Sequence, residues 1–135
     1  MKTLCLLALT GLMLSMAMQA LAKPPLFDAH LHYSQRDADV FTPEDILEKF
    51  DQSGIEQAIV TSTPPQTVQS LHQAAPERIV PFLGLYRDAA DKQSWVYDQS
   101  LPARMEEWLE EYDWAGIGEI HIFAINGNSP VFTAI

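Results

Sequence analysis

Two hydrophobic spacings alternate along most of this 135-residue chain. Short apolar runs rich in β-branched residues occupy 26–32, 57–63, 79–86 and 116–123, and turn residues bound each run. Runs of this length and composition predict β-strands. Because the cores of these runs are apolar on both faces, we expect a sheet that is covered on two sides.

Helical spacing separates these runs. Residues 42–54 start with Thr42 as an N-cap and Pro43 in the first turn, and Gly54 supplies a stop. A second helix is predicted within 66–75. A third follows Pro102, where apolar side chains recur at i, i+3, i+4 and i+7 and glutamates point outward. These positions are Met105, Trp108, Leu109 and Tyr112.

The resulting order, β-α-β-α-β-α-β, predicts an α/β fold. Strands that alternate with helices pair in parallel through right-handed crossovers. A polar connection at 87–100 joins the third strand to the third helix, and connections of this kind often line a site.

The chain begins with a pattern that predicts a secretory signal peptide over residues 1–22. Lys2 gives a positive start, residues 3–22 are uncharged and apolar, and Ala20-Leu21-Ala22 forms a small-x-small cleavage pattern. A retained membrane anchor is the alternative, and the prolines that follow favour cleavage. The mature protein is then expected to be exported, periplasmic or secreted, without a membrane span. Cys5 would be lost with the leader, so the mature chain could form no disulfide.

The charge balance is strongly acidic. Loss of Lys2 leaves seven Lys and Arg against 18 Asp and Glu, a net charge of −11. Nucleic acids and anionic membranes attract positive charge, so we expect neither as the main partner. A small-molecule substrate is expected instead.

The last residues predict the start of another helix, with Ser129 as N-cap and Pro130 at the first position. Only about one turn follows before Ile135, and a helix that short does not stabilise itself. We therefore expect residues 23–135 to form a partial domain, truncated at the C-terminus of a longer protein.

Chemistry-bearing side chains gather in the first predicted strand, LFDAHLH. On a strand, residues at i, i+2 and i+4 share one face, so Asp28, His30 and His32 should point the same way. Two imidazoles at this spacing can bind one metal ion, and zinc accepts such nitrogen ligands readily. Asp28 would act in the second shell of ligands or contact substrate. An HxH pair by itself is a weak motif.

The fourth predicted strand, GIGEIHIF, repeats this pattern with Glu119 and His121. Parallel β/α proteins build sites at the carboxyl ends of their strands, so both pairs should meet at one end of the sheet. Alternatives stay open: an arginine ion pair for Glu119, and packing or substrate contact for His121. His72 lies in the second helix and is interpreted as an ordinary helix residue.

FDAHLH directly after a leader, followed by β/α units and GIGEIH, resembles the amidohydrolase superfamily of metal-dependent hydrolases, most closely its amidohydrolase-related branch. The resemblance implies a (β/α)₈ TIM barrel of which this chain holds the N-terminal half, four parallel strands alternating with helices. It also implies one or two divalent ions, with His30, His32 and Glu119 as ligands. Zn²⁺ is favoured over Mn²⁺ or another ion.

The resemblance implies that the full-length protein is an enzyme in which a metal-activated water cleaves a C–N or ester-type bond. Further ligands and a catalytic aspartate would lie beyond Ile135, so this chain alone is expected to be inactive. A decarboxylase on the same scaffold is one alternative. Another is a non-catalytic metal-binding half-barrel, which as a homo-oligomer could close the sheet. A DNase of the same superfamily is disfavoured by the negative charge.

Overall fold

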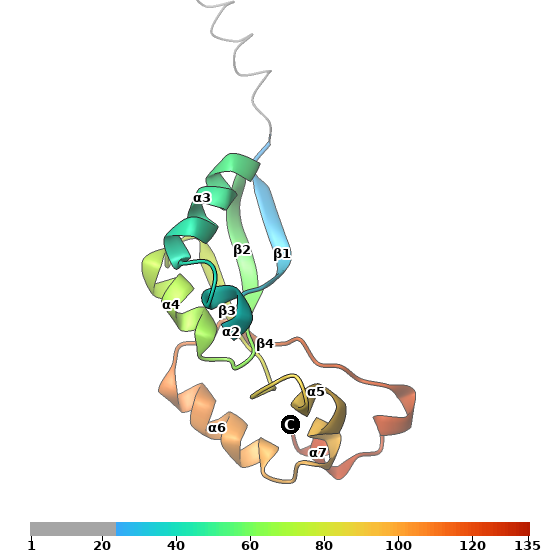
Figure 1. The fold of residues 1–135 in the computed structure, drawn as a ribbon. Helices are drawn as coiled ribbons and strands as arrows, with labels where there is room; N and C mark the ends of the chain where they lie inside the picture. The colour runs from blue at the N-terminus through green and yellow to red at the C-terminus, as the bar shows by residue number, and fades with distance from the viewer. Residues whose placement is uncertain (1–23) are drawn as a thin grey trace, which may run out of the picture.

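A sheet of four parallel strands forms the centre of the computed structural model, which describes residues 24–135 (Figure 1). The predicted signal peptide lies outside these residues. The strand order β1-β2-β3-β4 follows the sequence, and each neighbouring pair is parallel. The strands are β1 (Leu26–His32), β2 (Ile55–Thr61), β3 (Ile79–Leu83) and β4 (Gly116–Ile117).

Helices connect every successive pair of strands. The α-helices are α2 (Gln35–Ala38), α3 (Pro43–Ser53), α4 (Thr67–Ala74), α5 (Asp91–Ser94), α6 (Leu101–Glu111) and α7 (Pro130–Ala134). Two 3₁₀ turns are η1 (Trp95–Tyr97) and η2 (Ala124–Asn126). Four parallel strands with helical crossovers make the N-terminal half of a (β/α)₈ barrel, which confirms the predicted fold class.

The helix α3 has the ends that its sequence predicts. The Thr42 side chain accepts a hydrogen bond from the Asp45 backbone N–H at 3.2 Å, and the Asp45 carboxylate accepts one from the Thr42 backbone N–H at 2.8 Å. This reciprocal capping box satisfies two N–H groups at the helix start. Gly54 ends the helix with φ +74°, a left-handed conformation that favours glycine.

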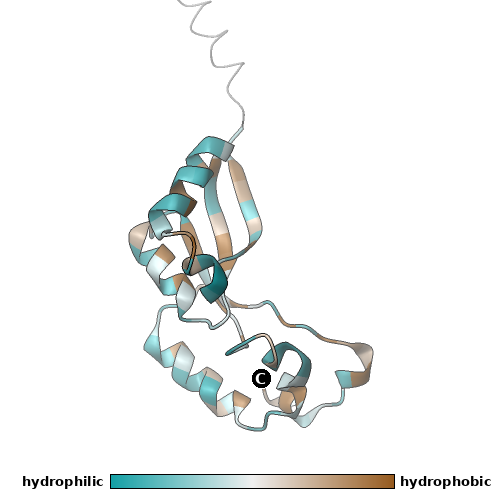
Figure 2. Ribbon diagram, in the orientation of Figure 1, coloured by the Kyte–Doolittle hydropathy of each residue, from teal (hydrophilic) through white to brown (hydrophobic). Residues whose placement is uncertain are grey.

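One hydrophobic core lies between the sheet and the helices α3 and α4, which Figure 1 shows on the same side of β1 and β2. Side chains on β3 alternate between buried and half-buried, because one strand face meets the helices and the other faces away. In Figure 2, α3 and α4 each show both brown and teal, as amphipathic helices should. The fully buried members of this core include Ala58, Val60, Val68 and Leu71.

A second hydrophobic cluster lies beyond the carboxyl ends of the strands, where Figure 1 places α5, α6 and α7. Trp95, Met105 and Val131 are buried in it. The predicted N-cap Ser129 is confirmed: its side chain accepts from the Val131 backbone N–H at 3.2 Å and donates to the Val96 carbonyl at 2.6 Å. The short helix α7 is therefore held by tertiary contacts that its sequence does not supply locally.

The sequence placed several boundaries incorrectly. The strand β4 has two residues, whereas the sequence predicted a strand over 116–123. Gly118 follows it with φ +156°, and the chain after it leaves strand geometry. Similarly, β3 ends at Leu83 because Leu85 and Tyr86 pack into the second cluster.

The connection over 87–100 is also more ordered than its polar composition predicted. It contains α5 and η1, and both Trp95 and Val96 are buried. Among the described residues, no helix combines the length and the apolar composition that crossing a bilayer requires.

Strand β1 contains an irregularity that sequence periodicity cannot reveal. Asp28 pairs with Ala58, and Leu31 pairs with Val60. Strand β1 therefore advances by three residues where β2 advances by two. An extra residue of this kind is a β-bulge, and it shifts which side chains share a face. The strict alternation predicted for residues 28–32 therefore does not extend through the whole strand.

Candidate metal centre

Three side chains from opposite ends of the described chain meet at the carboxyl end of the sheet. The Nε2 atoms of His30 and His32 lie 2.9 Å apart. The Oε2 atom of Glu119 lies 3.3 Å from His32 Nε2 and 3.9 Å from His30 Nε2. One ligand-type atom from each residue falls within 4.8 Å of the others. The predicted convergence of these residues is therefore present.

His32 is oriented by a neighbour on β2. The Thr61 hydroxyl lies 3.1 Å from His32 Nδ1, and Thr61 is almost fully buried. When Nδ1 carries the proton and donates to this hydroxyl, Nε2 keeps a free lone pair on the side of His30 and Glu119. Burial lowers the pKa of His32, and this outweighs the opposite influence of Glu119. The net effect of the surroundings therefore favours the neutral imidazole, the form that binds metals.

Glu119 lies between the strand-one histidines and His121. Its Oε2 atom is 3.3 Å from His121 Nε2 as well as from His32 Nε2. Burial acts to raise the pKa of Glu119, but the hydrogen bond from His121 and the nearby imidazoles lower it more, so the net shift is downward. Glu119 is therefore ionised at neutral pH and can act as an anionic ligand.

The backbone of His121 is held from two directions. Its N–H donates to the Tyr86 hydroxyl at 2.7 Å, and its carbonyl accepts from Trp95 Nε1 at 3.0 Å. Tyr86 and Trp95 both belong to the second hydrophobic cluster. The segment that carries Glu119 and His121 is thus fixed by side chains from the β3–α6 connection, and not by strand pairing.

Asp28 occupies a different position from the one that regular alternation predicts. Its Oδ1 atom accepts a hydrogen bond from the His30 backbone N–H at 3.0 Å, next to the bulge. The carboxylate therefore supports the main chain of His30, and Asp28 is not part of the three-residue group at the centre. His72 instead meets the Tyr112 hydroxyl at 2.6 Å on the helical side of the molecule.

These donor atoms fit a divalent cation. Ligands that share one ion at ~2.0–2.1 Å lie roughly 3 Å from each other, close to the His30–His32 and His32–Glu119 separations. Two imidazole nitrogens and a carboxylate form a set that suits zinc and related transition ions. The side chains of His30 and His32 are 60% and 39% exposed, which leaves room for further ligands.

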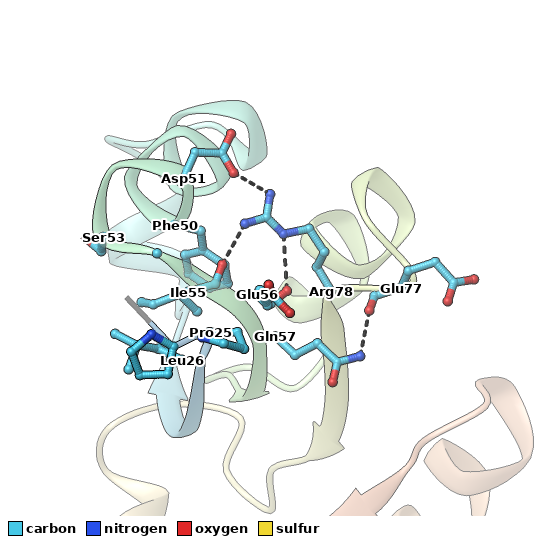
Figure 3. A pocket seen from close by; sticks show the side chains of 12 residues that line it. Pro25, Leu26, Phe50, Asp51, Ser53, Ile55, Glu56, Gln57, Glu77 and Arg78 are labelled. Carbon is cyan, nitrogen blue, oxygen red and sulfur yellow. Dashed lines mark hydrogen bonds and ion pairs between the residues drawn. The ribbon is translucent and has the colours of Figure 1, made fainter. Parts of the chain in front are cut away.

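Cavity size does not locate this centre. A cavity of about 210 Å³ is lined by His30 and Glu119 together with Phe82. A much larger one, about 900 Å³, lies at the amino ends of the strands, where Arg78 is already bonded to its neighbours (Figure 3). Parallel β/α folds place function at the carboxyl ends, and stability at the amino ends.

Sequence reasoning missed the residues that support the centre, namely Thr61, Tyr86 and Trp95. Thr61 ends an apolar run, so its position at a strand terminus was a usable signal. Tyr86 and Trp95 carry no such signal, because only the tertiary fold brings them to residue 121.

In a comparison with protein families, the model of the family described as TatD related DNase matches residues 27–121. No curated protein and no solved structure matches the chain. The family match includes His30, His32 and Glu119, and it confirms the expected superfamily of metal-dependent hydrolases at this coarser level. This chain belongs to the TatD-related DNase family, a family of metal-dependent hydrolases with an amidohydrolase-like TIM-barrel fold.

Proposed function

We propose that this protein hydrolyses phosphodiester bonds in DNA, using a divalent ion held by His30, His32 and Glu119. The observation that carries the proposal is the convergence of these three ligand atoms within 4.8 Å at the carboxyl end of the sheet. The family match over 27–121 supports a nuclease-type hydrolase. We keep zinc as the expected ion, because imidazole and carboxylate donors suit it.

When bound, such an ion polarises a phosphoryl or carbonyl oxygen and lowers the pKa of water. The protein's own groups prepare the site for this chemistry. Thr61 fixes the His32 ring, and Asp28 holds the backbone of His30. The hydrogen bond from His121 lowers the pKa of Glu119, and the His121 Nε2 atom lies 3.3 Å from Glu119 Oε2. We infer that His121 acts as a positioning residue and not as a ligand.

A second candidate is a hydrolase or decarboxylase of small molecules, as in the amidohydrolase-related branch. The net charge of −10 favours it, because a polyanionic strand is repelled by an acidic protein. The expectation from sequence of no nucleic-acid partner rested on the same acidity, taken there as −11 after loss of the leader. The two candidates share the metal centre and differ in substrate, so a substrate comparison separates them.

Metal binding is the first test, because it needs only groups that are present in the described site. We expect the purified chain to bind about one Zn²⁺ or Mn²⁺ per molecule by calorimetry, and the His30→Ala/His32→Ala variant to bind at least 100-fold more weakly. His72→Gln is the matched control, since it alters a histidine outside the centre. Full metal binding by the double variant would refute the assignment.

Hydrolysis is the second test. DNA oligonucleotides and a neutral carboxylic ester should be compared with and without added metal, together with a carboxylated substrate for the decarboxylase. Metal-dependent cleavage of DNA alone would support the nuclease. The three grouped ligands include no aspartate that could act as a catalytic base, so we expect little or no turnover from these 135 residues. A stable dimer, identified by size-exclusion chromatography, that binds metal without turnover of any substrate would favour the non-catalytic metal-binding module.

A further inference from the structure

A second cavity opens at the same end of the sheet as the metal centre. It encloses about 420 Å³, and its walls are the segments that follow β1, β2 and β3. Three cationic side chains line it: Arg36, Arg87 and Lys92. The whole chain has eight Lys and Arg against 18 Asp and Glu, so this gathering runs against the overall charge.

Within the described residues, Arg87 is paired with Asp91, and its Nη2 atom also lies 3.7 Å from Asp98 Oδ2, so the uncompensated positive charge of this cavity comes from Arg36 and Lys92. Among residues 24–135, neither Arg36 nor Lys92 has a carboxylate partner within ion-pair distance. Asp88 is the one acidic residue in the lining, and its Oδ1 atom accepts from the backbone N–H groups of Ala90 and Asp91 at 2.7 and 3.1 Å. Concave cationic surfaces of this kind attract anions.

Arg87 is held in position by its own connection. Its guanidinium donates to both carboxylate oxygens of Asp91, at 2.8 and 2.9 Å, and the Asp91 side chain is mostly buried. More than half of the Arg87 side chain stays exposed, which leaves a face for a ligand. The N–H groups of a planar guanidinium fixed in this way can donate to phosphate oxygens in a defined geometry.

Short contacts connect the residues that line this cavity to the residues around the metal centre. The Lys92 ammonium lies 5.7 Å from the centre of the Tyr86 ring, and the Tyr86 hydroxyl accepts from the His121 backbone N–H. Ser34 lines the cavity and lies two residues beyond His32 in the chain. Its hydroxyl accepts a hydrogen bond from the Thr63 backbone N–H at 3.1 Å. The Cα atoms of His32 and Ser34 are therefore roughly 7 Å apart at most. One or two nucleotides of a strand cover a distance of this size.

We propose that Arg36, Arg87 and Lys92 form a subsite that binds a phosphate of the nucleic-acid strand next to the phosphodiester at the metal centre. This inference rests on the proposed function for its substrate, but it makes a separate claim about binding. The subsite would explain how an acidic protein can hold a polyanion: among the described residues, Arg36 and Lys92 place two cations without ion-pair partners at this end of the sheet, although the net charge of the chain is negative. The contacts would orient the strand and carry no sequence preference.

The test is binding of a fluorescein-labelled 12-nucleotide DNA strand, measured by anisotropy in EDTA so that no metal contributes. We expect Lys92→Gln and Arg36→Gln each to weaken binding about 5-fold, and to reduce the slope of log K against log salt by about 0.7. Lys49→Gln is the matched control, because Lys49 lies on α3 against the Phe41 ring and outside this cavity. It should change binding less than 1.5-fold.

A strand of the same sequence with neutral methylphosphonate linkages distinguishes phosphate recognition from base contacts, and we expect it not to bind. Millimolar inorganic phosphate should compete with the natural strand. Equal binding of the neutral strand, equal weakening by Lys49→Gln, or no binding by the unmodified protein would each overturn the proposal. Melting curves of the three variants establish that each is folded.

The same variants separate this inference from the proposed function. If the protein binds metal through His30 and His32 and cleaves a small ester but binds no strand, the subsite is refuted and metal-dependent hydrolysis stands. If the strand binds through Lys92 while the His30→Ala/His32→Ala variant keeps its metal, the metal assignment is refuted and the subsite stands.

Discussion

The two ends of the sheet use their polar side chains in opposite ways. At the amino ends, Arg78 donates to the Asp51 carboxylate and to the Ile55 carbonyl, both at 2.7 Å, and it also reaches the Glu56 carbonyl (Figure 3). These bonds join the segment before β3 to α3 and to β2. At the carboxyl ends, the imidazoles and Glu119 face one another instead of the main chain.

This difference explains why the larger cavity is not the better site. The Arg78 guanidinium at the amino ends already has partners within the fold, so a ligand that binds it would have to replace those bonds. The imidazoles of His30 and His32 instead hold two acceptor-capable nitrogens 2.9 Å apart, an arrangement that a shared cation stabilises. Polar side chains that are bonded within the fold therefore indicate a role in stability. Ligand-type atoms that face one another indicate a binding site.

The largest expected effect on stability comes from the amino end. Arg78→Ala removes hydrogen bonds from a charged donor to two carbonyls and a carboxylate, and each such bond contributes about 1.5–3 kcal/mol. Because Asp51 is exposed and water can replace part of these bonds, we expect the free energy of unfolding in urea to fall by about 2–3 kcal/mol, less than their sum, with unchanged metal affinity. Arg36→Ala, an exposed arginine at the other end, should change stability by less than about 0.5 kcal/mol. A loss of metal affinity in Arg78→Ala would break the distinction between the two ends.

The next effect tests the carboxyl end without touching a ligand. Thr61→Val keeps the volume of the side chain and removes the hydroxyl that faces His32 Nδ1. Because outer groups of this kind tune metal affinity by roughly 10–100-fold, we expect about tenfold weaker Zn²⁺ binding by calorimetry. Thr61→Ser keeps the hydroxyl and should restore the affinity. Unchanged binding by Thr61→Val would show that His32 is oriented by other contacts.

A smaller effect on stability is expected from loss of the N-cap of α3, which lies outside the metal centre. Thr42 caps the N-terminus of α3. It contacts Asp45 but none of the grouped ligands. Thr42→Ala should lower the unfolding free energy by about 1 kcal/mol, as loss of an N-cap generally does. Thr42→Ser should keep most of that stability. Metal affinity should stay the same in both variants.

The smallest effect concerns acid stability of the β3–α6 connection. Hydrogen bonds from Ser100 and Arg104 lower the pKa of Asp98 to about 2, and the bond from Arg87 lowers the pKa of Asp91. A lowered folded-state pKa gives stability that is present above the unfolded pKa of about 4 and is lost as the pH falls towards 2. Asp98→Asn should therefore flatten the fall in stability between pH 5 and pH 2. Asp113→Asn removes the same charge outside this cluster, and an equal flattening there would contradict the assignment.

Much of the fold was accessible from sequence because the signals were local. The helix α3 appeared with its N-cap Thr42 and its stop at Gly54, since capping depends on residues a few positions apart. Strand β1 appeared with its predicted bounds, Leu26–His32. The short β4 did not, because the packing of Tyr86 and Trp95 against residue 121 replaces strand pairing there.

The metal centre was predictable only in part. His30 and His32 are two residues apart, so their meeting needs only an extended backbone. Their meeting with Glu119 followed from the general rule that parallel strands end on one side. The position of Asp28 could not be predicted, because the β-bulge depends on the pairing between β1 and β2.

The sequence by itself determined the alternation of strands and helices, the caps, and which residues bear ligand-type groups, because hydrophobic spacing and short-range hydrogen bonds set these features. The tertiary structure alone decided that Thr61 faces His32, that Tyr86 and Trp95 fix the backbone of residue 121, and that Arg36, Arg87 and Lys92 line one cavity. These contacts join residues that are distant in sequence. No local pattern encodes such contacts, since they form only when the strands have paired.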